Sequence, residues 1–425
     1  MILNLSIQNF LSFKEKAVFS FEATKDNTHE ATHVVKVAPG VRIGKLGVIY
    51  GANASGKSNL LEAFDFLIRF WRSKPESKTE KTGVVPFLLD SASRNKPSVF
   101  SLTFYIDGQK HVYELVLYSD KVISETLSYY PGTQPASIFY RLFEDNVSKI
   151  NFGSTIKVSS AAKDEISVKC LANTSLFAAY ESVNVNIPEL EKVVSWINHN
   201  FLPVVEPLSE LTNYVKKRMQ EDKTVRSFIL NFLKEADYNI SDITTKTETK
   251  KVSETFLRLA SELDIPAGER NRLLKEKTLE TIHALFTHNV TTKSGTFAEH
   301  QLSEALQSRG TLRTLGVAGV ISQAVAEDSF LAIDEIESSL HPKLVEFILE
   351  QFLKLSDRAQ LLVTTHNDSL LEEQDLLRKD NVWFTSKKKD GSSELYSLSD
   401  FQGLGRISSI QKAYKYGKFG AIPNI

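Results

Sequence analysis

The alternation of apolar and polar residues predicts short strands at the start of the chain, over residues 1–21. A second apolar run, residues 45–50, predicts a strand that stops at a glycine-containing loop. After this loop, residues 59–70 carry apolar side chains at helical spacing. The local order is therefore strand, loop, helix.

Strict alternation predicts antiparallel strands over residues 99–106 and 112–118, with Asp107 and Gly108 as the turn between them. The middle of the chain is expected to be mainly helical, over residues 189–201 and then from about 208 to 288. Apolar residues at helical spacing support this expectation, including the series Phe256, Leu259 and Leu263. Residues 244–250 are polar enough to be a loop, and the absence of sustained heptads argues against a long coiled coil.

From residue 311 the pattern returns to alternating helices and strands. It predicts two helices, at 316–326 and 343–355, and two buried strands, at 329–333 and 360–365. The chain is thus expected to be an α/β protein whose core is split by a long insertion. The expected parts are residues 1–185, with an antiparallel β lobe, an inserted helical lobe over 186–298, and the remainder of the core over 299–425.

Composition narrows the class of protein. A chain of 425 residues with 42% hydrophobic and 24% charged residues is ordinary for a globular protein of two or three lobes. The net charge of −1 gives no global attraction to nucleic acid or to anionic lipid, so such binding would need a local patch. The lone Cys170 cannot form an intramolecular disulfide. With no secretory signal and no run of 18 apolar residues, we expect a cytoplasmic protein without a membrane span.

Residues 51–58, Gly-Ala-Asn-Ala-Ser-Gly-Lys-Ser, fill every fixed position of a phosphate loop, between a predicted strand and a predicted helix. Backbone N–H groups of such a loop surround the β-phosphate, Lys57 reaches the β- and γ-phosphates, and Ser58 offers a hydroxyl to Mg²⁺. The segment predicts ATP or GTP binding, the alternative being a chance loop before a helix. The expected binding residues are Gly51, Asn53, Ala54, Ser55, Gly56, Lys57, Ser58 and Asn59.

Two carboxylates, Asp334 and Glu335, directly follow the apolar strand of residues 330–333. We expect Asp334 to hold Mg²⁺, through water, and Glu335 to polarise the attacking water. The alternative is an acidic turn before a helix, where carboxylates are favoured in any case. His366 ends the next buried strand and could contact the γ-phosphate or orient the water, although a histidine at a strand end is often structural or solvated.

Together these segments resemble the ABC-type ATPases of the SMC, RecF and OLD branch. Residues 7–13 are similar to the first strand and turn of that branch, residues 334–342 to its Walker B motif and D-loop, and residues 362–366 to its switch-histidine strand. The resemblance implies an ABC-type P-loop ATPase core with an antiparallel β lobe, and ATP and Mg²⁺ as cofactors. Lys57, Glu335 and His366 would then be the catalytic residues.

Residues 306–313 resemble a divergent signature motif of the same branch. The resemblance implies that Ser308 and Gly310 contact the γ-phosphate of a nucleotide bound to another subunit, and hence a homodimer or a higher homo-oligomer. Serine and glycine at this spacing are also an ordinary helix N-cap. The Q-loop of this branch has no clear counterpart in the sequence, and residues 85–87 are the candidate region for it.

The hairpin, residues 138–141 and the tail over 395–401 and 412–423 resemble compact bacterial AAA/OLD-like ATPases of anti-phage defence operons. The 59 residues after His366 are too few for the TOPRIM nuclease domain of OLD proteins, and no other nuclease or hydrolase signature is found. The resemblance therefore implies a Mg²⁺-dependent ATPase whose ATP-driven dimer closure regulates a separately encoded nuclease or toxin. Nucleic acid or a phage protein is the expected kind of trigger.

The alternative function is a RecF- or SMC-like DNA-binding ATPase in repair or recombination. Lysines 387–389 could touch a phosphate backbone, but a charge run before Asp390 and Gly391 is more typical of a solvated hairpin tip.

Overall fold

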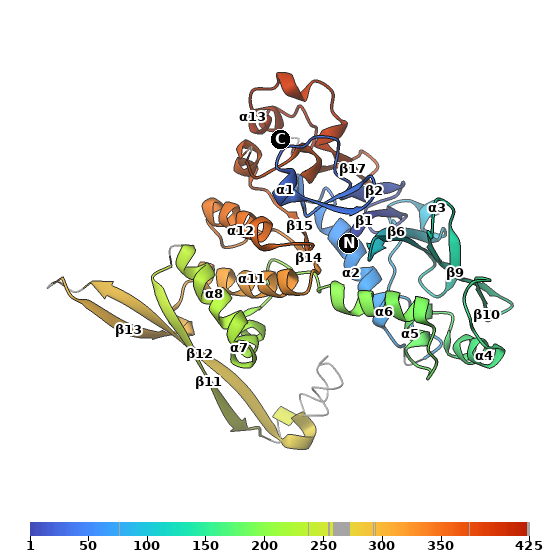
Figure 1. Cartoon of the computed structure of the whole chain (residues 1–425), viewed down its shortest axis with the longest axis horizontal. Helices are drawn as coiled ribbons and strands as arrows, with labels where there is room; N and C mark the ends of the chain where they lie inside the picture. The colour runs from blue at the N-terminus through green and yellow to red at the C-terminus, as the bar shows by residue number, and fades with distance from the viewer. Residues whose placement is uncertain are drawn as a thin grey trace. The chain divides into compact units, whose positions relative to one another are not determined.

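The computed structural model describes residues 1–75, 77–236, 238–253, 256–257, 273–291, 293, 295–373 and 375–422. The chain forms two compact units (Figure 1). Unit 1 comprises Met1–Ser209, Ala324–Ser338 and Pro342–Ile425, and unit 2 comprises Glu210–Gln323 and Ser339–His341. The predicted α/β class is confirmed. Compared with the insert expected over 186–298, the second unit begins and ends later along the chain.

A five-stranded sheet organises the site-bearing part of unit 1. Its order is β14-β15-β5-β16-β17, with β5 (Leu46–Gly51) at the centre and entirely buried. The neighbours β15 (Gln360–Thr364) and β16 (Val382–Lys387) and the outer β14 (Phe330–Ile333) run parallel to β5. The carboxyl ends of these four strands therefore meet at one edge, which is where open α/β sheets bind ligands.

The antiparallel strand β17 (Ser393–Ser397) closes this sheet through a hairpin from β16. Lysines 387–389 lie at this hairpin, where Lys388 pairs with Glu394 at 2.6 Å. The prediction of a hairpin tip for this charge run is confirmed.

The second sheet of unit 1 has seven antiparallel strands in the order β10-β9-β8-β7-β6-β1-β2. Asp107 and Gly108 join β6 to β7 as predicted, both with positive φ, which favours the tight turns of hairpins. The strands are β1 (Ile2–Gln8), β2 (Ala17–Ser20), β6 (Ser98–Ile106), β7 (Gln109–Leu117), β8 (Val122–Tyr129), β9 (Ala136–Glu144) and β10 (Val147–Phe152).

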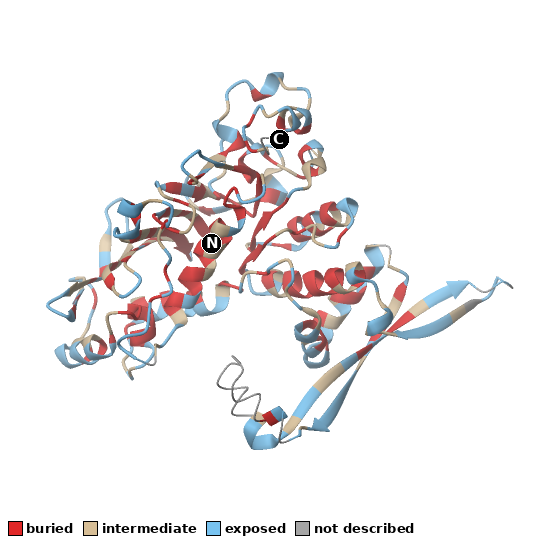
Figure 2. Ribbon diagram, turned by 180° about the vertical axis from the view of Figure 1, so that it is seen from behind, coloured by how far each residue is buried: buried red, intermediate tan, exposed pale blue. Residues whose placement is uncertain are grey.

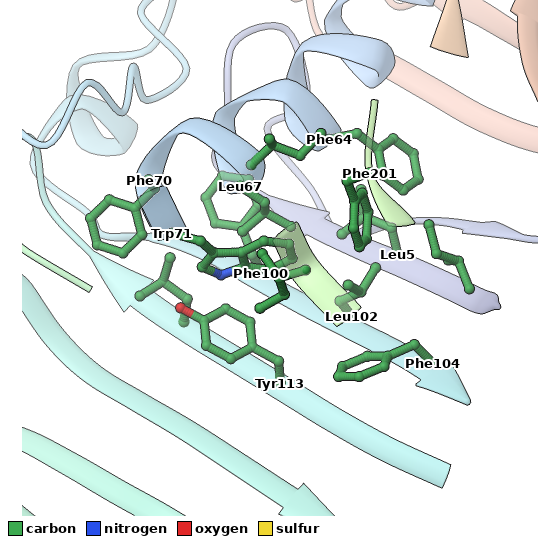
Figure 3. Close-up of a cluster of buried hydrophobic side chains, with 14 of the residues drawn as sticks. Leu5, Phe64, Leu67, Phe70, Trp71, Phe100, Leu102, Phe104, Tyr113 and Phe201 are labelled. Carbon is green, nitrogen blue, oxygen red and sulfur yellow. The ribbon is translucent and has the colours of Figure 1, made fainter. Parts of the chain in front are cut away.

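Helix α2 (Lys57–Arg72) packs between these two sheets. Figure 3 shows its aromatic residues against side chains of the seven-stranded sheet. The ring centroids of Phe66 and Phe100 are 4.9 Å apart, and those of Trp71 and Tyr113 are 5.4 Å apart. Because this apolar contact holds α2 along its length, it also fixes where the helix begins, at Lys57.

The other helices and strands of unit 1 lie around this core. Helix α6 (Pro188–Asn200), predicted at 189–201, stacks Trp196 on Phe104 with ring centroids 4.4 Å apart. The remaining elements are α1 (Glu30–His33), β3 (Val34–Ala38), β4 (Val41–Gly44), α3 (Ser91–Arg94), α4 (Ser160–Lys169), α5 (Leu176–Tyr180), α12 (Pro342–Leu355), α13 (Ile410–Lys415) and short 3₁₀ turns.

Unit 2 corrects the prediction of a helical insert. Helices α7 (Thr212–Glu221) and α8 (Lys223–Glu235) are followed by an antiparallel sheet of β11 (Ile240–Lys251), β12 (Thr278–Thr291) and β13 (Phe297–Ser303). The loop expected at residues 244–250 is thus part of a strand. The part of the helical prediction that falls on residues 258–272, including Leu259 and Leu263, lies outside the described residues.

The prediction of helix and loop failed for β11 for a physical reason. Most of β11 is exposed on both faces, as Figure 2 shows in pale blue, so it lacks the alternation of apolar and polar residues that marks a half-buried strand. Its β-branched threonines, a residue type enriched in strands, were the remaining indication of a strand. The unit ends in α11 (Arg309–Ala326), which begins seven residues earlier than predicted and runs into unit 1 at Ala324. Within the described residues, no helix is both long and apolar enough to cross a bilayer.

Candidate functional site

The predicted phosphate loop, Gly51–Ser58, connects the carboxyl end of β5 to the start of α2. Gly56 has a φ of 112°, and a Cβ there would lie 2.4 Å from Ser393 Oγ, so both the backbone and the space require glycine. Ala54 also has a positive φ, of 59°. The loop forms one wall of a cavity of about 570 Å³, and residues Asn53 to Asn59 line it.

Hydroxyl groups from distant segments hold this loop in place. The hydroxyls of Ser55 and Thr385 are 2.6 Å apart, and Ser393 Oγ donates to the carbonyl of Ser55 at 2.6 Å. Asn59 Nδ2 donates to Ser12 Oγ at 2.7 Å. Sequence analysis missed these supporting residues, because single serines and threonines carry no motif.

Lys57 is 5% exposed and points back over the loop. Its Nζ donates to the carbonyl of Gly51 at 3.0 Å and to that of Ala52 at 3.2 Å. Burial lowers the pKa of Lys57, while the nearby carboxylates of Asp334 and Glu335 oppose that shift. The ammonium group is thus placed where a bound phosphate would compensate for its desolvation.

His366, at the end of β15, meets Lys57 directly. Its Nε2 lies 3.0 Å from Lys57 Nζ and 4.0 Å from Glu335 Oε1. Burial lowers the pKa of His366, and the charge of Lys57 lowers it further. In the neutral tautomer that carries its proton on Nδ1, Nε2 can accept a hydrogen bond from the lysine.

Thr364 orients the two predicted carboxylates at the end of β14. Its hydroxyl donates to Asp334 Oδ1 at 2.5 Å and accepts from the backbone N of Glu335 at 2.8 Å. Glu335 has a φ of 44°, an uncommon conformation for a residue other than glycine. These contacts direct the Glu335 side chain into the same cavity as the phosphate loop and His366.

Glu337 belongs to the same cluster, although sequence analysis assigned it no role. Its Oε1 accepts from the backbone N of His366 at 2.5 Å. Its Oε2 is buried and has no hydrogen-bond partner within the part of the chain that the structure describes. Glu337 therefore ties the turn after β14 to the residue that ends β15. Its position two residues after Glu335 was the sequence feature that could have indicated a place in the site.

The residues predicted to hold Mg²⁺, Ser58 and Asp334, both line a second cavity of about 530 Å³, together with Glu335. Across the described residues, no cluster of three or more histidine, cysteine or acidic side chains could bind an ion alone. A hydroxyl and one carboxylate fit Mg²⁺ that arrives with nucleotide, since this ion keeps several waters and takes phosphate oxygens.

The Q-loop candidate, residues 85–87, lines the first cavity, followed by Leu88 and Leu89. None of these side chains carries an oxygen or a nitrogen, so none can act as a ligand for Mg²⁺. The segment is an apolar part of the cavity that the phosphate loop also lines.

Ser308 and Gly310 lie in unit 2. Ser308 Oγ accepts from the backbone N of Thr311 at 3.0 Å, just where α11 begins, which is the N-cap that the sequence allowed as an alternative. A Cβ on Gly310 would lie 3.0 Å from the carbonyl of Ser339, in the same unit. Contact of these residues with a second subunit's nucleotide stays a prediction.

Comparisons with known proteins give one family match. Residues 46–372 match the family described as "AAA domain, putative AbiEii toxin, Type IV TA system". A comparison with curated proteins finds no match.

Among solved structures, the SMC head domain from Thermotoga maritima is 13% identical, with a TM-score of 0.41, and the alignment covers 93% of this chain and 98% of that one. An Smc head domain bound to a domain of ScpA from Pyrococcus furiosus is 12% identical, with a TM-score of 0.40 and 98% of both chains covered. At these scores the likeness adds nothing to the family match.

Proposed function

The chain belongs to this AAA-domain family, and from that premise we propose that it is a Mg²⁺-dependent ATPase. In this proposal, ATP drives closure of a dimer, and closure regulates a separately encoded nuclease or toxin in anti-phage defence. One observation carries the proposal. Lys57 and Glu335, from opposite ends of the sequence, lie 3.0 and 4.0 Å from the same nitrogen of His366. This proximity of residues from three segments that lie far apart in the sequence supports the proposal of phosphoryl transfer to water.

The roles of these residues follow from their chemistry. Backbone N–H groups of the phosphate loop and the charge of Lys57 stabilise the β- and γ-phosphates. Glu335 polarises the attacking water, and the neutral His366 positions the γ-phosphate or that water. Ser58 and Asp334 would hold Mg²⁺, which neutralises charge that develops on the phosphates.

Closure would couple hydrolysis to regulation. In the proposed homodimer, ATP on the phosphate loop of one subunit meets Ser308 and Gly310 of the other, so ATP favours the closed pair because it contacts both subunits only there. Hydrolysis removes that difference in affinity. Unit 2 would pass the change to the effector, after a trigger such as nucleic acid or a phage protein.

The setting proposed is the cytoplasm of a bacterium. A single cysteine, Cys170, which is buried, agrees with a reducing compartment. The toxin named in the family description agrees with a toxin-type defence system.

The test is affinity purification of the tagged Glu335→Gln protein from its native host with Mg²⁺-ATP, with and without phage infection. This variant should bind ATP but hydrolyse it slowly, and it should retain a nuclease or toxin at a stoichiometric level. Lys57→Ala, with the same tag, is the matched control and should retain neither nucleotide nor effector.

Three results would change the proposal. Recovery of DNA alone, lost at higher salt, would favour the DNA-binding repair ATPase. Hydrolysis by Glu335→Gln at the wild-type rate would remove Glu335 from its assigned role. Lack of nucleotide binding by the wild-type protein would refute the proposal as a whole.

A further inference from the structure

We propose that the apolar segment of residues 85–89 is the binding surface for the purine base of the nucleotide, and that it does not distinguish adenine from guanine. This inference rests on the proposed function, since it requires a nucleotide on the phosphate loop. The inference extends the proposed function by naming the part of the chain that holds the base and the selectivity of that part.

The first observation is a group of solvent-exposed apolar side chains beside the phosphate loop. The side chains of Val85, Leu88 and Leu89 are 39%, 49% and 68% exposed, and all three line the cavity of about 570 Å³ together with Leu11. Exposed apolar side chains that gather at one wall of a pocket favour an apolar, planar partner. A purine base, joined through its ribose to phosphates on the phosphate loop of the same cavity, has such a face.

The second observation is that this wall is held rigidly. Leu11 N donates to the carbonyl of Val85 at 2.9 Å, and Phe87 N donates to Asn9 Oδ1 at 3.1 Å. Arg94 Nε donates to the carbonyl of Leu88 at 2.7 Å. The surface thus needs little ordering when the base binds, which increases affinity.

Leu89 lies close to Gly391, which belongs to the hairpin between β16 and β17 and lines the same cavity. A Cβ on Gly391 would lie only 2.4 Å from Leu89 Cδ1. Because Gly391 also has a positive φ of 82°, the close approach of Leu89 depends on glycine at this position.

The third observation concerns selectivity. The side chains of residues 85–89 are hydrocarbon, and the amide of Phe87 and the carbonyls of Val85 and Leu88 already have hydrogen-bond partners. A site that hydrogen-bonds a distinguishing group can discriminate by roughly 10⁴-fold or more, whereas apolar contact discriminates far less. Ser12 and Asn59 are hydrogen-bonded to each other, and other polar side chains of the same cavity, including Asn53, Lys387, Glu335 and His366, lie outside this segment. Residues 85–89 therefore offer adenine and guanine the same apolar surface.

The experiment measures the affinity of the full-length protein for ATP, GTP and inorganic tripolyphosphate, each with Mg²⁺. For the wild type we expect ATP and GTP affinities within about tenfold of each other, and both above that of tripolyphosphate, which has no base. Leu88→Ser and Leu89→Ser should each weaken ATP and GTP about fivefold and to the same extent, from lost apolar contact, and leave tripolyphosphate unchanged. Leu355→Ser, at a 45% exposed leucine on α12, is the matched control and should change none of the three.

Photolabelling with 8-azido-ATP gives a second readout that needs no variant. Trypsin cleaves after Lys81 and Arg94, so the segment would be recovered in the peptide of residues 82–94. We expect the label in that peptide, and labelling confined to other peptides would overturn the assignment.

The outcomes separate this inference from the function on which it rests. A preference of ATP over GTP above about 100-fold, or serine variants that bind ATP as the wild type does, would overturn the inference alone. A wild-type protein that binds neither nucleotide nor tripolyphosphate would overturn the proposed function as well. Serine variants that keep nucleotide affinity but lose self-association would assign the segment to a protein contact instead.

Discussion

Replacement of Thr364 by valine removes one hydroxyl from the centre of the site and keeps the shape of the side chain. Thr364 is fully buried, and its hydroxyl joins Asp334 Oδ1 to the backbone N of Glu335. Valine leaves both of these groups without that partner. The substitution therefore tests whether the end of β15 positions the two carboxylates that follow β14.

The expected magnitude follows from the two bonds. A hydrogen bond to a charged group contributes about 1.5–3 kcal/mol and a neutral one about 0.5–1.5 kcal/mol, so we expect the free energy of unfolding to fall by about 2–4.5 kcal/mol. Glu335, released from its bond, can relax from its positive φ, and a displacement of about 1 Å at a reacting group can cost roughly 100-fold in rate. We expect kcat to fall about 10- to 100-fold. Nucleotide affinity measured without Mg²⁺ should change little, because the hydrogen bonds of Lys57 go to Gly51, Ala52 and His366 and not to Thr364.

The assay pairs ATP hydrolysis with chemical denaturation followed by tryptophan fluorescence. All three tryptophans, Trp71, Trp196 and Trp383, lie in unit 1, so the signal reports the unit that carries Thr364. Thr364→Ser keeps the hydroxyl and should hydrolyse ATP nearly as the wild type does. If Thr364→Val kept both the wild-type kcat and the wild-type unfolding midpoint, the role given to this hydroxyl would be wrong.

Three further predictions concern other contacts. Glu337→Ala should lower kcat at least about tenfold with a smaller change in KM, whereas Glu337→Gln should retain activity, because its amide oxygen can accept from the same N–H of His366; equal rates for both variants would contradict a positioning role. Burial lowers the pKa of His111 to about 4, so the unfolded chain binds this proton below about pH 6.5 and the folded chain only below about 4. Unit 1 should therefore lose about 3 kcal/mol of stability as the pH falls through this window, and His111→Phe should flatten the loss in denaturation series at several pH values. Subunits with Ser308→Arg and Lys57→Ala, each inactive alone, should regain hydrolysis when mixed, and a mixture that co-assembles but stays inactive would count against the shared site.

The phosphate loop and its partners could be predicted because their chemistry is local in sequence. A strand, a glycine-containing loop and a helix mark residues 51–58, and an apolar strand with two carboxylates marks Asp334 and Glu335. That His366 lies near the phosphate site could be expected because it ends the next buried strand after Asp334 and Glu335, although it is 309 positions from Lys57 in the sequence.

The supporting residues could not be predicted in the same way. Ser12, Thr385 and Ser393 are common polar residues whose role arises from strand order, which brings their segments to the phosphate loop. The exposed sheet of unit 2 escaped prediction for a different reason. Periodicity reports burial on one face, and most of β11 is not buried on either.

The position of β5 between β15 and β16 has a consequence for synthesis of the protein. β5 leaves the ribosome about 310 residues before β15, which at about 5–20 residues per second is a delay of roughly 15–60 s. During that interval both edges of β5, which is entirely buried in the finished sheet, lack their partners, so the nascent chain exposes a strand that could pair with another chain. In the proposed mechanism, no nascent chain shorter than 366 residues carries Lys57, Glu335 and His366 together, so none of these chains could hydrolyse nucleotide. Late completion of the sheet would thus keep the proposed ATPase inactive while the chain is being made.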